Sequence, residues 1–374
     1  MNSLTPMPGH VRQQRTASPN LGFSTLMNPS SSFLPTERPA LVLAPMQDVT
    51  DLPFMRLMAR YGGPDLFVTE YFRVTPSSQL DPVTLRSITE NDTGKPVLAQ
   101  MIGQDIPALV RTAKELERYP VAGIDLNLGC PAPVVCRKDA GGGLLRDPAR
   151  VDSILQALRD AIQGRFTVKC RVGFADKGEF PRLLEVFQKH AIQMLTIHGR
   201  TVRDAYKTPV HPECVAQAVA AMPCPVIANG NVVDVATGDS YLSKTSAAGL
   251  MIGRGAIRHP WIFDQLRAQW SGQSMSPPTR RDLLEYIRLL YEHTAAFQAL
   301  HHATPSRVKQ VQKMKRYMAF ISNGIDEGVF EHRIRRATAE EEFFAICQEH
   351  LDRNDELPVR PPADSHVFCG FDAL

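Results

Sequence analysis

Eight short apolar runs between residues 40 and 253 constrain the fold more than any other feature of this sequence. The runs are ALVLAP (40–45), DLFVTE (65–70), PVLAQMI (96–102), GIDLNL (123–128), FTVKCRV (166–172), QMLTIHG (193–199), PVIANG (225–230) and AGLMIG (248–253). Each is nearly continuous in its apolar character, as expected of parallel strands covered on both faces. Intervening segments such as 106–119 and 148–162 carry apolar residues at spacings of three and four, typical of helices. The alternation predicts a (β/α)8 TIM barrel, an α/β fold, with an open doubly wound sheet as the structural alternative.

Composition restricts the class of protein. The 374 residues are 43% hydrophobic and 22% charged, which is ordinary for a globular chain. No apolar run reaches the roughly 20 residues that span a bilayer, and the start lacks a signal-peptide pattern, so we expect a cytoplasmic protein without membrane contact. We also expect a monomer. Seven cysteines, an odd number without paired CxxC spacings, predict reduced thiols and no metal site. A net charge of +3 is too small to identify a partner.

The chain divides into four predicted segments. Residues 1–38 are rich in Pro, Ser, Thr and Asn without any period, and predict a disordered tail. The barrel is expected over 39–272, followed by a linker at MSPPT (275–279). Residues 280–352 have helical patterns and no strand pattern, so they predict a smaller helical domain. Residues 353–374 are expected to form a flexible tail.

Chemically distinctive residues stand at, or just beyond, the ends of successive apolar runs. Because barrel enzymes build their sites at the carboxyl ends of the strands, these residues should share one mouth. They are Pro45, Met46, Gln47, Glu70, Gln100, Asn127, Cys130, Lys169, Arg171, His198, Arg200, Asn229, Gly230, Gly253 and Arg254. A loop residue that only caps a strand is the simple alternative for any one of them, but it explains the whole set poorly.

Two glycine-containing turns follow the seventh and eighth runs, ANGNVVD (228–234) and IGRGAIR (252–258). Backbone N–H groups of such turns can approach a ligand closely, and this is the usual phosphate-binding place in TIM barrels. We therefore expect a phosphate-bearing ligand. No GxGxxG follows a strand and no GxxxxGK[ST] occurs, so Rossmann and P-loop sites are not indicated. The triple glycine at 141–143 is better explained as a tight loop before a helix.

Ordered motifs within this pattern resemble the tRNA-dihydrouridine synthases of bacteria. They are LAPMQDVTD, VTEYF, AQMIGQ, DLNLGCPAPVV, VKCRVG, IHGRT, VIANGN and GLMIGRGA, and the order of GCP, VKCR and HGRT is the specific part. The resemblance implies an FMN enzyme that uses NADPH to reduce the 5,6 double bond of D-loop uridines in tRNA. Similarity to the branch that acts near position 16 is loose, so the target uridine stays open, with position 16 as one candidate.

The resemblance also implies roles for individual residues. Residues that would face the isoalloxazine ring or its N1 and O2 side are Pro45, Met46, Gln47, Gln100 and Lys169, and His198 would contact the cofactor as well. Residues that would hold the FMN phosphate are Asn229, Gly230, Asn231, Gly253 and Arg254. Residues that would hold the target uracil are Asn127, Arg200 and Tyr206.

The position of Cys130, just beyond an apolar run, suits the implied reaction. Hydride delivery to C6 of uracil leaves negative charge over C5 and O4, and C5 then needs a proton. A general acid must still carry its proton at the working pH, which a thiol of ordinary pKa near ~8.5 does and a carboxylic acid near ~4 does not. We therefore expect Cys130 to be the proton donor. Cys136 and Cys170 raise a metal alternative, but Cys170 alternates with Lys169 and Arg171 and should point away from them.

The segment 304–324 predicts a helix with two different faces, in which Thr304 is the N-cap, Pro305 the first helical position, and Asn323 with Gly324 marks the end. Val308, Val311, Met314, Met318 and Ile321 form an apolar stripe that predicts core packing, whereas another stripe is basic and contains Lys309, Lys313 and Arg316. A basic face is usually only solvated. Given the resemblance, however, this domain matches the family's tRNA-binding module, and Lys313 and Arg316 become candidate tRNA contacts. Arg333, Arg335 and Arg336 form a second basic group.

Two readings from other classes compete with this one. An FMN barrel that reduces a free pyrimidine or an enone would bind flavin without affinity for tRNA, and would leave the basic helices without a role. A non-catalytic tRNA-binding protein would be expected to have lost its rim residues, yet Cys130, Lys169 and His198 are all present.

Overall fold

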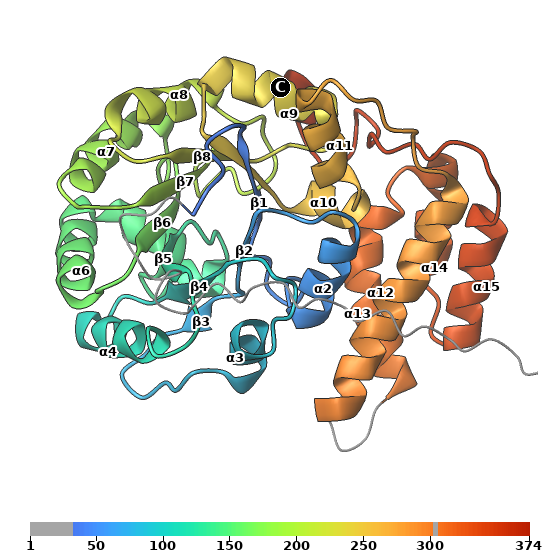
Figure 1. The fold of residues 1–374 in the computed structure, drawn as a ribbon, viewed down its shortest axis with the longest axis horizontal. Helices are drawn as coiled ribbons and strands as arrows, with labels where there is room; N and C mark the ends of the chain where they lie inside the picture. Colours follow the sequence, from blue (N-terminus) through green and yellow to red (C-terminus); the bar gives the residue numbers. More distant parts are fainter. Residues whose placement is uncertain (1–32, 302–305) are drawn as a thin grey trace, which may run out of the picture.

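Eight parallel strands close into a barrel in the computed structural model, which describes residues 33–301 and 306–374 (Figure 1). The strands are β1 (Ala40–Leu43), β2 (Leu66–Val68), β4 (Val97–Ile102), β5 (Gly123–Leu128), β6 (Phe166–Arg171), β7 (Met194–His198), β8 (Val226–Asn229) and β9 (Gly249–Ile252). They are ordered β2-β1-β9-β8-β7-β6-β5-β4, and pairing of β2 with β4 closes the ring. A two-residue strand, β3 (Phe72–Arg73), adds to β4. The predicted TIM barrel is confirmed, and the open sheet is excluded.

Alternating side chains of the strands build two cores. On β1, Ala40 and Val42 point into the barrel and Leu41 and Leu43 face the surrounding helices, and all four are fully buried. Burial on both faces explains why the strands read as continuous apolar runs. The outer helices and turns are α2 (Leu52–Arg60), α3 (Pro82–Thr89), α4 (Ile106–Leu116), α5 (Pro133–Cys136), η1 (Gly141–Arg146), α6 (Pro148–Ala161), η2 (Lys177–Glu179), α7 (Phe180–Gln188), α8 (Pro212–Ala221), α9 (Val235–Thr245), α10 (Arg254–Arg258) and α11 (Ile262–Trp270).

Aspartates fix where several barrel helices begin. Each accepts a hydrogen bond from a backbone N–H in the first turn, which satisfies a donor that the helix itself cannot pair. They are Asp51 of α2, Asp81 of α3, Asp105 of α4, Asp147 of α6 and Asp234 of α9. The first four are followed within two residues by a proline, whose missing N–H costs nothing at that position.

The end of the predicted N-terminal tail is packed against the barrel. Phe33 and Leu34 pack against the inner core cluster. Arg38 forms a bidentate ion pair with Asp65, with N–O distances of 2.8 and 2.7 Å. The tail prediction was therefore wrong for residues 33–38, because apolar and charged partners on the barrel hold them. Residues 1–32 of that predicted tail lie outside the described residues.

A helical domain packs against one side of the barrel, as predicted (Figure 1). Its elements are α12 (Arg280–His301), α13 (Arg307–Ile321), η3 (Ile325–Gly328), α14 (Val329–Ile334) and α15 (Glu340–Leu351). Hydroxyl groups cross the domain interface, since Tyr286 donates to the Ile257 carbonyl at 3.1 Å and Tyr317 to the Val49 carbonyl at 3.3 Å. The predicted apolar stripe of α13 is buried from Val311 to Ile321, although Val308 is exposed. The predicted cap at Thr304 and Pro305 lies outside the described residues, and the Ser306 hydroxyl accepts from the Lys309 N–H at the start of the helix.

Within the described residues, no helix is both long and apolar enough to cross a membrane.

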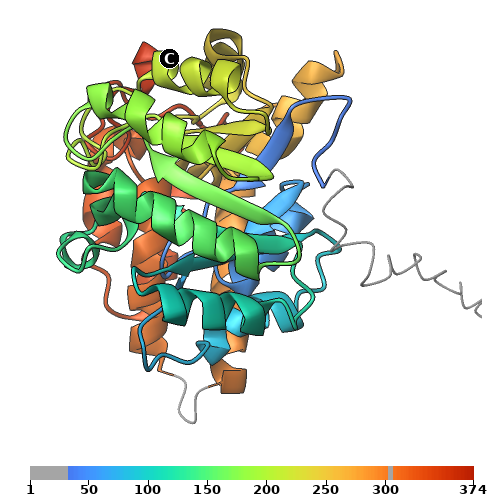
Figure 2. The same ribbon diagram turned by 90° about the vertical axis from the view of Figure 1, so that its left-hand side faces the viewer.

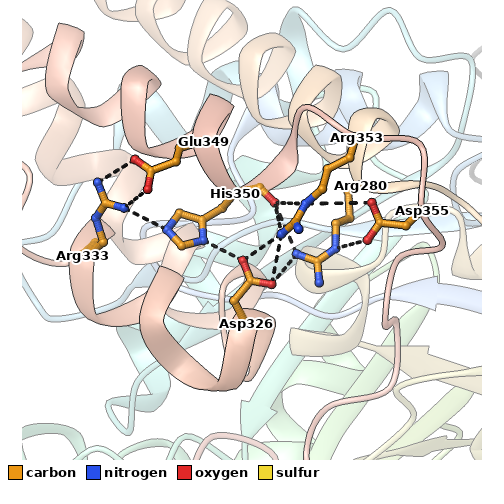
Figure 3. Close-up of polar contacts among 7 residues, drawn as sticks. All are labelled: Arg280, Asp326, Arg333, Glu349, His350, Arg353 and Asp355. Carbon is orange, nitrogen blue, oxygen red and sulfur yellow. Dashed lines mark hydrogen bonds and ion pairs between the residues drawn. The ribbon is translucent and has the colours of Figure 1, made fainter.

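An ion-pair network joins the ends of the helices in this domain (Figure 3). Asp326 of η3 accepts from Arg280 at 2.8 Å, from Arg353 at 3.1 Å and from the His350 imidazole at 2.6 Å. Burial alone would raise the pKa of Asp326, but hydrogen bonds from His350 and Arg280 outweigh it and lower that pKa. Asp326 has a positive φ of 50°, which is unfavourable for a residue other than glycine. The network therefore holds a strained turn in place.

Residues 353–374 do not form the flexible tail that we expected. The segment leaves α15, passes back to the barrel and ends beside α9 (Figures 1 and 2). Phe368 and Phe371 are buried, and the short turn η4 (Phe371–Ala373) ends the chain. The sequence prediction was wrong here because the segment has no regular period, and its order comes from contacts with distant parts of the chain.

Candidate active site

A cavity of about 950 Å³ lies at the carboxyl ends of the barrel strands. It is lined by most of the residues that the sequence singled out: Pro45, Met46, Gln47, Asn127, Cys130, Lys169, Arg171, His198, Tyr206, Asn229, Gly230, Asn231, Gly253, Arg254 and Arg316. Gln100, Arg200 and Lys313 are not part of the lining. The barrel and the helical domain thus bring together predicted residues that lie up to 271 positions apart in the chain (Pro45 to Arg316).

Gln100 lies one layer below the cavity and not beside it, contrary to what we expected. Its side chain is fully buried, donates to Asp125 at 2.8 Å and accepts from the Asn127 amide at 2.8 Å. Asn127 in turn accepts from the backbone N–H groups of Gly129 and Cys130, at 3.0 and 2.9 Å. A continuous hydrogen-bonded chain therefore runs from the barrel interior to the loop that carries Cys130.

The triple glycine packs against this loop. The Gly142 N–H donates to the Cys130 carbonyl at 3.1 Å, and a Cβ on Gly142 would lie 2.9 Å from that oxygen. The glycines do not line the cavity, so their predicted use as a tight loop is the one observed. Cys136 donates its thiol to the Cys130 carbonyl at 3.5 Å, and Cys170 is buried in the outer core. No group of three or more His, Cys, Asp or Glu side chains suited to a metal ion occurs in the described ranges.

Lys169 extends from β6 into the cavity. Its ammonium donates to the Asn229 side-chain oxygen at 3.1 Å, and Asn229 is fixed by donating to the Met251 carbonyl at 2.7 Å. Burial and the nearby Arg171 lower the pKa of Lys169 to about 8. Below it, burial raises the pKa of Asp125 to about 6, although Thr167 and Gln100 both donate to that carboxylate.

His198 and Tyr206 form the wall next to Lys169. Burial and the positive charge of Arg171 and neighbouring basic residues lower the pKa of His198 well below its usual range, so its imidazole is neutral. Its buried Nδ1 has no hydrogen-bond partner among the described residues. Tyr206 packs edge-on to His198, and the guanidinium groups of Arg171 and Arg254 lie 5.1 and 4.5 Å from the centre of its ring.

The two turns predicted to bind phosphate meet at one end of the cavity. Gly230 has a φ of 122° and Asn231 a φ of 59°. Both residues of this turn after β8 line the cavity. Gly253 approaches Met46 so closely that a Cβ would lie 3.2 Å from its sulfur. Four basic residues and one acidic residue line the cavity: Lys169, Arg171, Arg254, Arg316 and Asp48. Such a site favours an anionic ligand.

Arg200 lies behind the β8 turn. Its guanidinium donates to the Asn231 side chain at 2.8 Å and to the Cys369 carbonyl at 2.8 Å, whereas its Nη1 is buried without a partner among the described residues. Its predicted contact with a uracil is therefore not supported by its position. It orients Asn231 instead.

The two basic candidates on α13 differ in their surroundings. Lys313 pairs with Asp51 at the start of α2, and its side chain is 18% exposed. Arg316 pairs with Asp48 at 2.8 Å, is 56% exposed and reaches the cavity wall. Lys313 therefore stabilises the domain interface, whereas Arg316 is accessible at the mouth.

Sequence reasoning missed several residues in the cavity wall or bonded to it. Glu70 was noted at a strand end but given no role, although burial and the nearby Asp51 and Asp48 raise its pKa to about 7. Tyr71 lines the cavity, as does Phe368 from the far end of the chain. The VTEYF motif could have indicated Tyr71. No local pattern could have indicated Phe368, because only the path of the C-terminal segment brings it to the barrel.

Comparisons with known proteins agree with this geometry. The family model "Dihydrouridine synthase (Dus)" matches residues 42–355. The "tRNA-dihydrouridine synthase B" of Pseudomonas putida is 35% identical, over 71% of this chain and 78% of its own length. The "tRNA-dihydrouridine(16) synthase" of Neisseria meningitidis is 29% identical, over 78% and 90%. The "tRNA-dihydrouridine synthase B" of Xanthomonas axonopodis is 30% identical, over 84% and 93%. By the extent of these matches and the order of its motifs around the cavity, this chain belongs to the dihydrouridine synthase family.

Proposed function

We propose that this protein reduces the 5,6 double bond of D-loop uridines in tRNA, with FMN as bound cofactor, NADPH as reductant and Cys130 as proton donor. The observation that carries the proposal is that Cys130, Lys169 and the two glycine turns line a single cavity. Family membership makes the chain a flavin-dependent oxidoreductase. The names of the relatives point to tRNA as the substrate. We further propose that it works in the cytoplasm as a monomer.

The cavity fits FMN in its size, charge and unused donors. Asn229, Gly230, Asn231, Gly253 and Arg254 would hold the phosphate, where the two turns and a guanidinium offer donors to an anion. Lys169 would provide a cation beside the flavin ring, and the unpartnered Nδ1 of His198 would find a partner in the cofactor. Pro45, Met46 and Gln47 would cover the ring. Bound FMN would supply the hydride after its reduction by NADPH.

We propose that Cys130 gives its proton to C5 of the uracil. Its thiol is at the cavity wall, and its backbone is held on both sides by Asn127 and Gly142. A donor fixed in this way can meet the developing negative charge without reorganisation of the loop. Tyr71 also lines the cavity, and burial raises the pKa of its hydroxyl, so it stays protonated.

Asn127 and Tyr206 are proposed to hold the uracil. The amide nitrogen of Asn127 has two hydrogens, of which Gln100 takes one. Tyr206 is 42% exposed, and its ring offers an aromatic surface at the mouth on which a base can stack. We propose that Arg316 contacts a tRNA phosphate next to the target base, exchanging its ion pair with Asp48 for that contact. Lys313 would support the same surface by fixing α13 to the barrel.

The first test is chemical. Purified protein is expected to be yellow and to release FMN on denaturation, and a preparation that stays free of flavin after reconstitution would contradict the proposal. Dihydrouridine is then mapped in tRNA from cells that lack the protein, and again after the wild-type protein is restored. Loss and recovery at one D-loop position would identify the target. If no D-loop position changes, tRNA is not the substrate.

A further inference from the structure

The C-terminal segment 356–374, here named the C-terminal strap, packs against the rest of the molecule although it lies beyond the family match, which ends at residue 355. It runs from the helical domain back across the barrel and ends beside α9 (Figure 1). It makes contacts with both domains along this path. Arg258 of α10 donates to the carbonyls of Pro358 and Val359 at 2.9 and 2.8 Å. Ser365 donates to the Asn323 side chain, just beyond α13, at 2.7 Å.

The far end of the strap is fixed to α9. The backbone oxygen of Leu374 accepts from the Lys244 ammonium at 2.6 Å and from the Ser240 hydroxyl at 2.5 Å. Arg360 pairs with Asp234, the cap of α9, at 3.1 Å. Phe368 and Phe371 are buried with Val233 in a small core of their own. The strap is thus held by both polar and apolar contacts.

Between these anchors the strap contacts the predicted phosphate end of the cavity. The Val367 carbonyl accepts from Nη1 of Arg254. The Cys369 carbonyl accepts from the Asn231 side chain at 3.1 Å and from Arg200 at 2.8 Å. His366, Val367 and Phe368 also form part of the cavity wall.

We propose that the C-terminal strap positions Arg254 and Asn231 for the phosphate of the bound cofactor and closes that end of the cavity. This inference rests on the proposed function, because it takes FMN as the ligand. The hydrogen bond from Nη1 of Arg254 to the Val367 carbonyl fixes the direction of the other guanidinium donors. Less conformational entropy is then lost when the phosphate binds. The strap residues act through Arg254 and Asn231 and are positioning residues.

The test compares two ligands that differ only in the phosphate. FMN and riboflavin are titrated against the full-length apoprotein, and the ratio of their affinities measures the contribution of the phosphate end. One variant ends at Asp355 and lacks the strap. A second, Ser240→Ala with Lys244→Ala, keeps the strap but removes its terminal anchors. Lys177→Ala is the matched control, because that lysine forms a surface ion pair with Glu213 at 2.7 Å and has no contact with the strap.

Loss of the strap is expected to lower the FMN-to-riboflavin affinity ratio about tenfold, the effect of losing one oriented hydrogen bond to a charged group. The anchor variant should show a smaller fall in the same direction, and faster FMN release measured by flavin fluorescence. Lys177→Ala should match the wild type. An unchanged ratio in the anchor variant, or equal losses for FMN and riboflavin, would overturn the inference, since a merely structural segment affects both ligands alike. If the wild type binds neither flavin, the proposed function itself fails.

Discussion

Replacing Gln100 with methionine should show whether the buried hydrogen-bonded chain beneath the cavity holds the fold and the Cys130 loop. Methionine has a similar length and volume, so the change leaves little empty space. It removes the donor to Asp125 and the acceptor for Asn127, both of which are buried. The backbone N–H of residue 100 keeps its bond to Thr69 at 3.1 Å. The loss is therefore confined to two polar contacts.

The expected cost follows from those two contacts. Leaving a buried polar group without a partner costs about 1–3 kcal/mol, so the two lost contacts of Gln100→Met should lower the free energy of unfolding by about 2–6 kcal/mol. The cost should also depend on pH. The pKa of Asp125 is already raised to about 6 by burial, and the hydrogen bond from Gln100 opposes that rise. Without the hydrogen bond from Gln100, the pKa of Asp125 in the native state should rise further. The destabilisation should therefore be greater at pH 8, where the carboxylate is charged, than at pH 5, where it is protonated.

Urea unfolding at the two pH values measures both effects. Gln104→Met is the matched control, because Gln104 is exposed at the surface and its replacement should change stability by less than about 0.5 kcal/mol. A Gln100→Met protein as stable as the control at pH 8 would refute the reasoning. So would an equal loss at both pH values, since the carboxylate would then have no part in it.

Four further substitutions concern the cavity wall and the residues next to it. Cys130→Ala should retain FMN and tRNA binding but lose at least about 100-fold in turnover, as expected for a general acid, and unaltered turnover would remove the proton-donor role. Arg316→Ala should weaken tRNA binding and flatten its salt dependence because fewer counterions are released. Lys313→Ala should mainly lower the free energy of unfolding, measured with urea, because it leaves Asp51 unpaired. If Lys313→Ala weakened tRNA binding in filter assays and Arg316→Ala lowered stability instead, the roles given to these two residues would be wrong. Glu70 has a native pKa raised to about 7, so the native state holds a proton that the unfolded chain releases above its ordinary value of 4.5. The free energy of unfolding should then fall as pH rises from about 4.5 to 7. Glu70→Gln should abolish the part of this fall that comes from Glu70. If the variant and the wild type have the same pH profile of thermal unfolding, Glu70 does not titrate in this range.

The sequence by itself determined the barrel and most of its mouth. Strands buried on both faces must be continuous apolar runs, and parallel strands all present their carboxyl ends at the same rim, so counting runs was enough to place Cys130, Lys169 and His198 together. The glycine turns could be recognised for the same reason, because a backbone that must approach a ligand closely needs residues such as Gly230 locally. Family resemblance then supplied roles that the residue pattern alone could not.

Only the tertiary structure decided which polar residues face the cavity and which support it. Gln100 and Asn127 both lie near the carboxyl ends of apolar runs, yet Gln100 is buried beneath the cavity and Asn127 lines it. The depth of a side chain in the barrel depends on the stagger of neighbouring strands, and Gln100 is level with Asp125, two residues before Asn127. Lys313 and Arg316 share a basic stripe, but only the packing of α13 against α2 separates an interface ion pair from an accessible one. The C-terminal strap carries no periodic signal. Its order comes from carbonyl groups that accept from Arg254 and Arg200 more than a hundred residues away, and such contacts exist only once the barrel has formed.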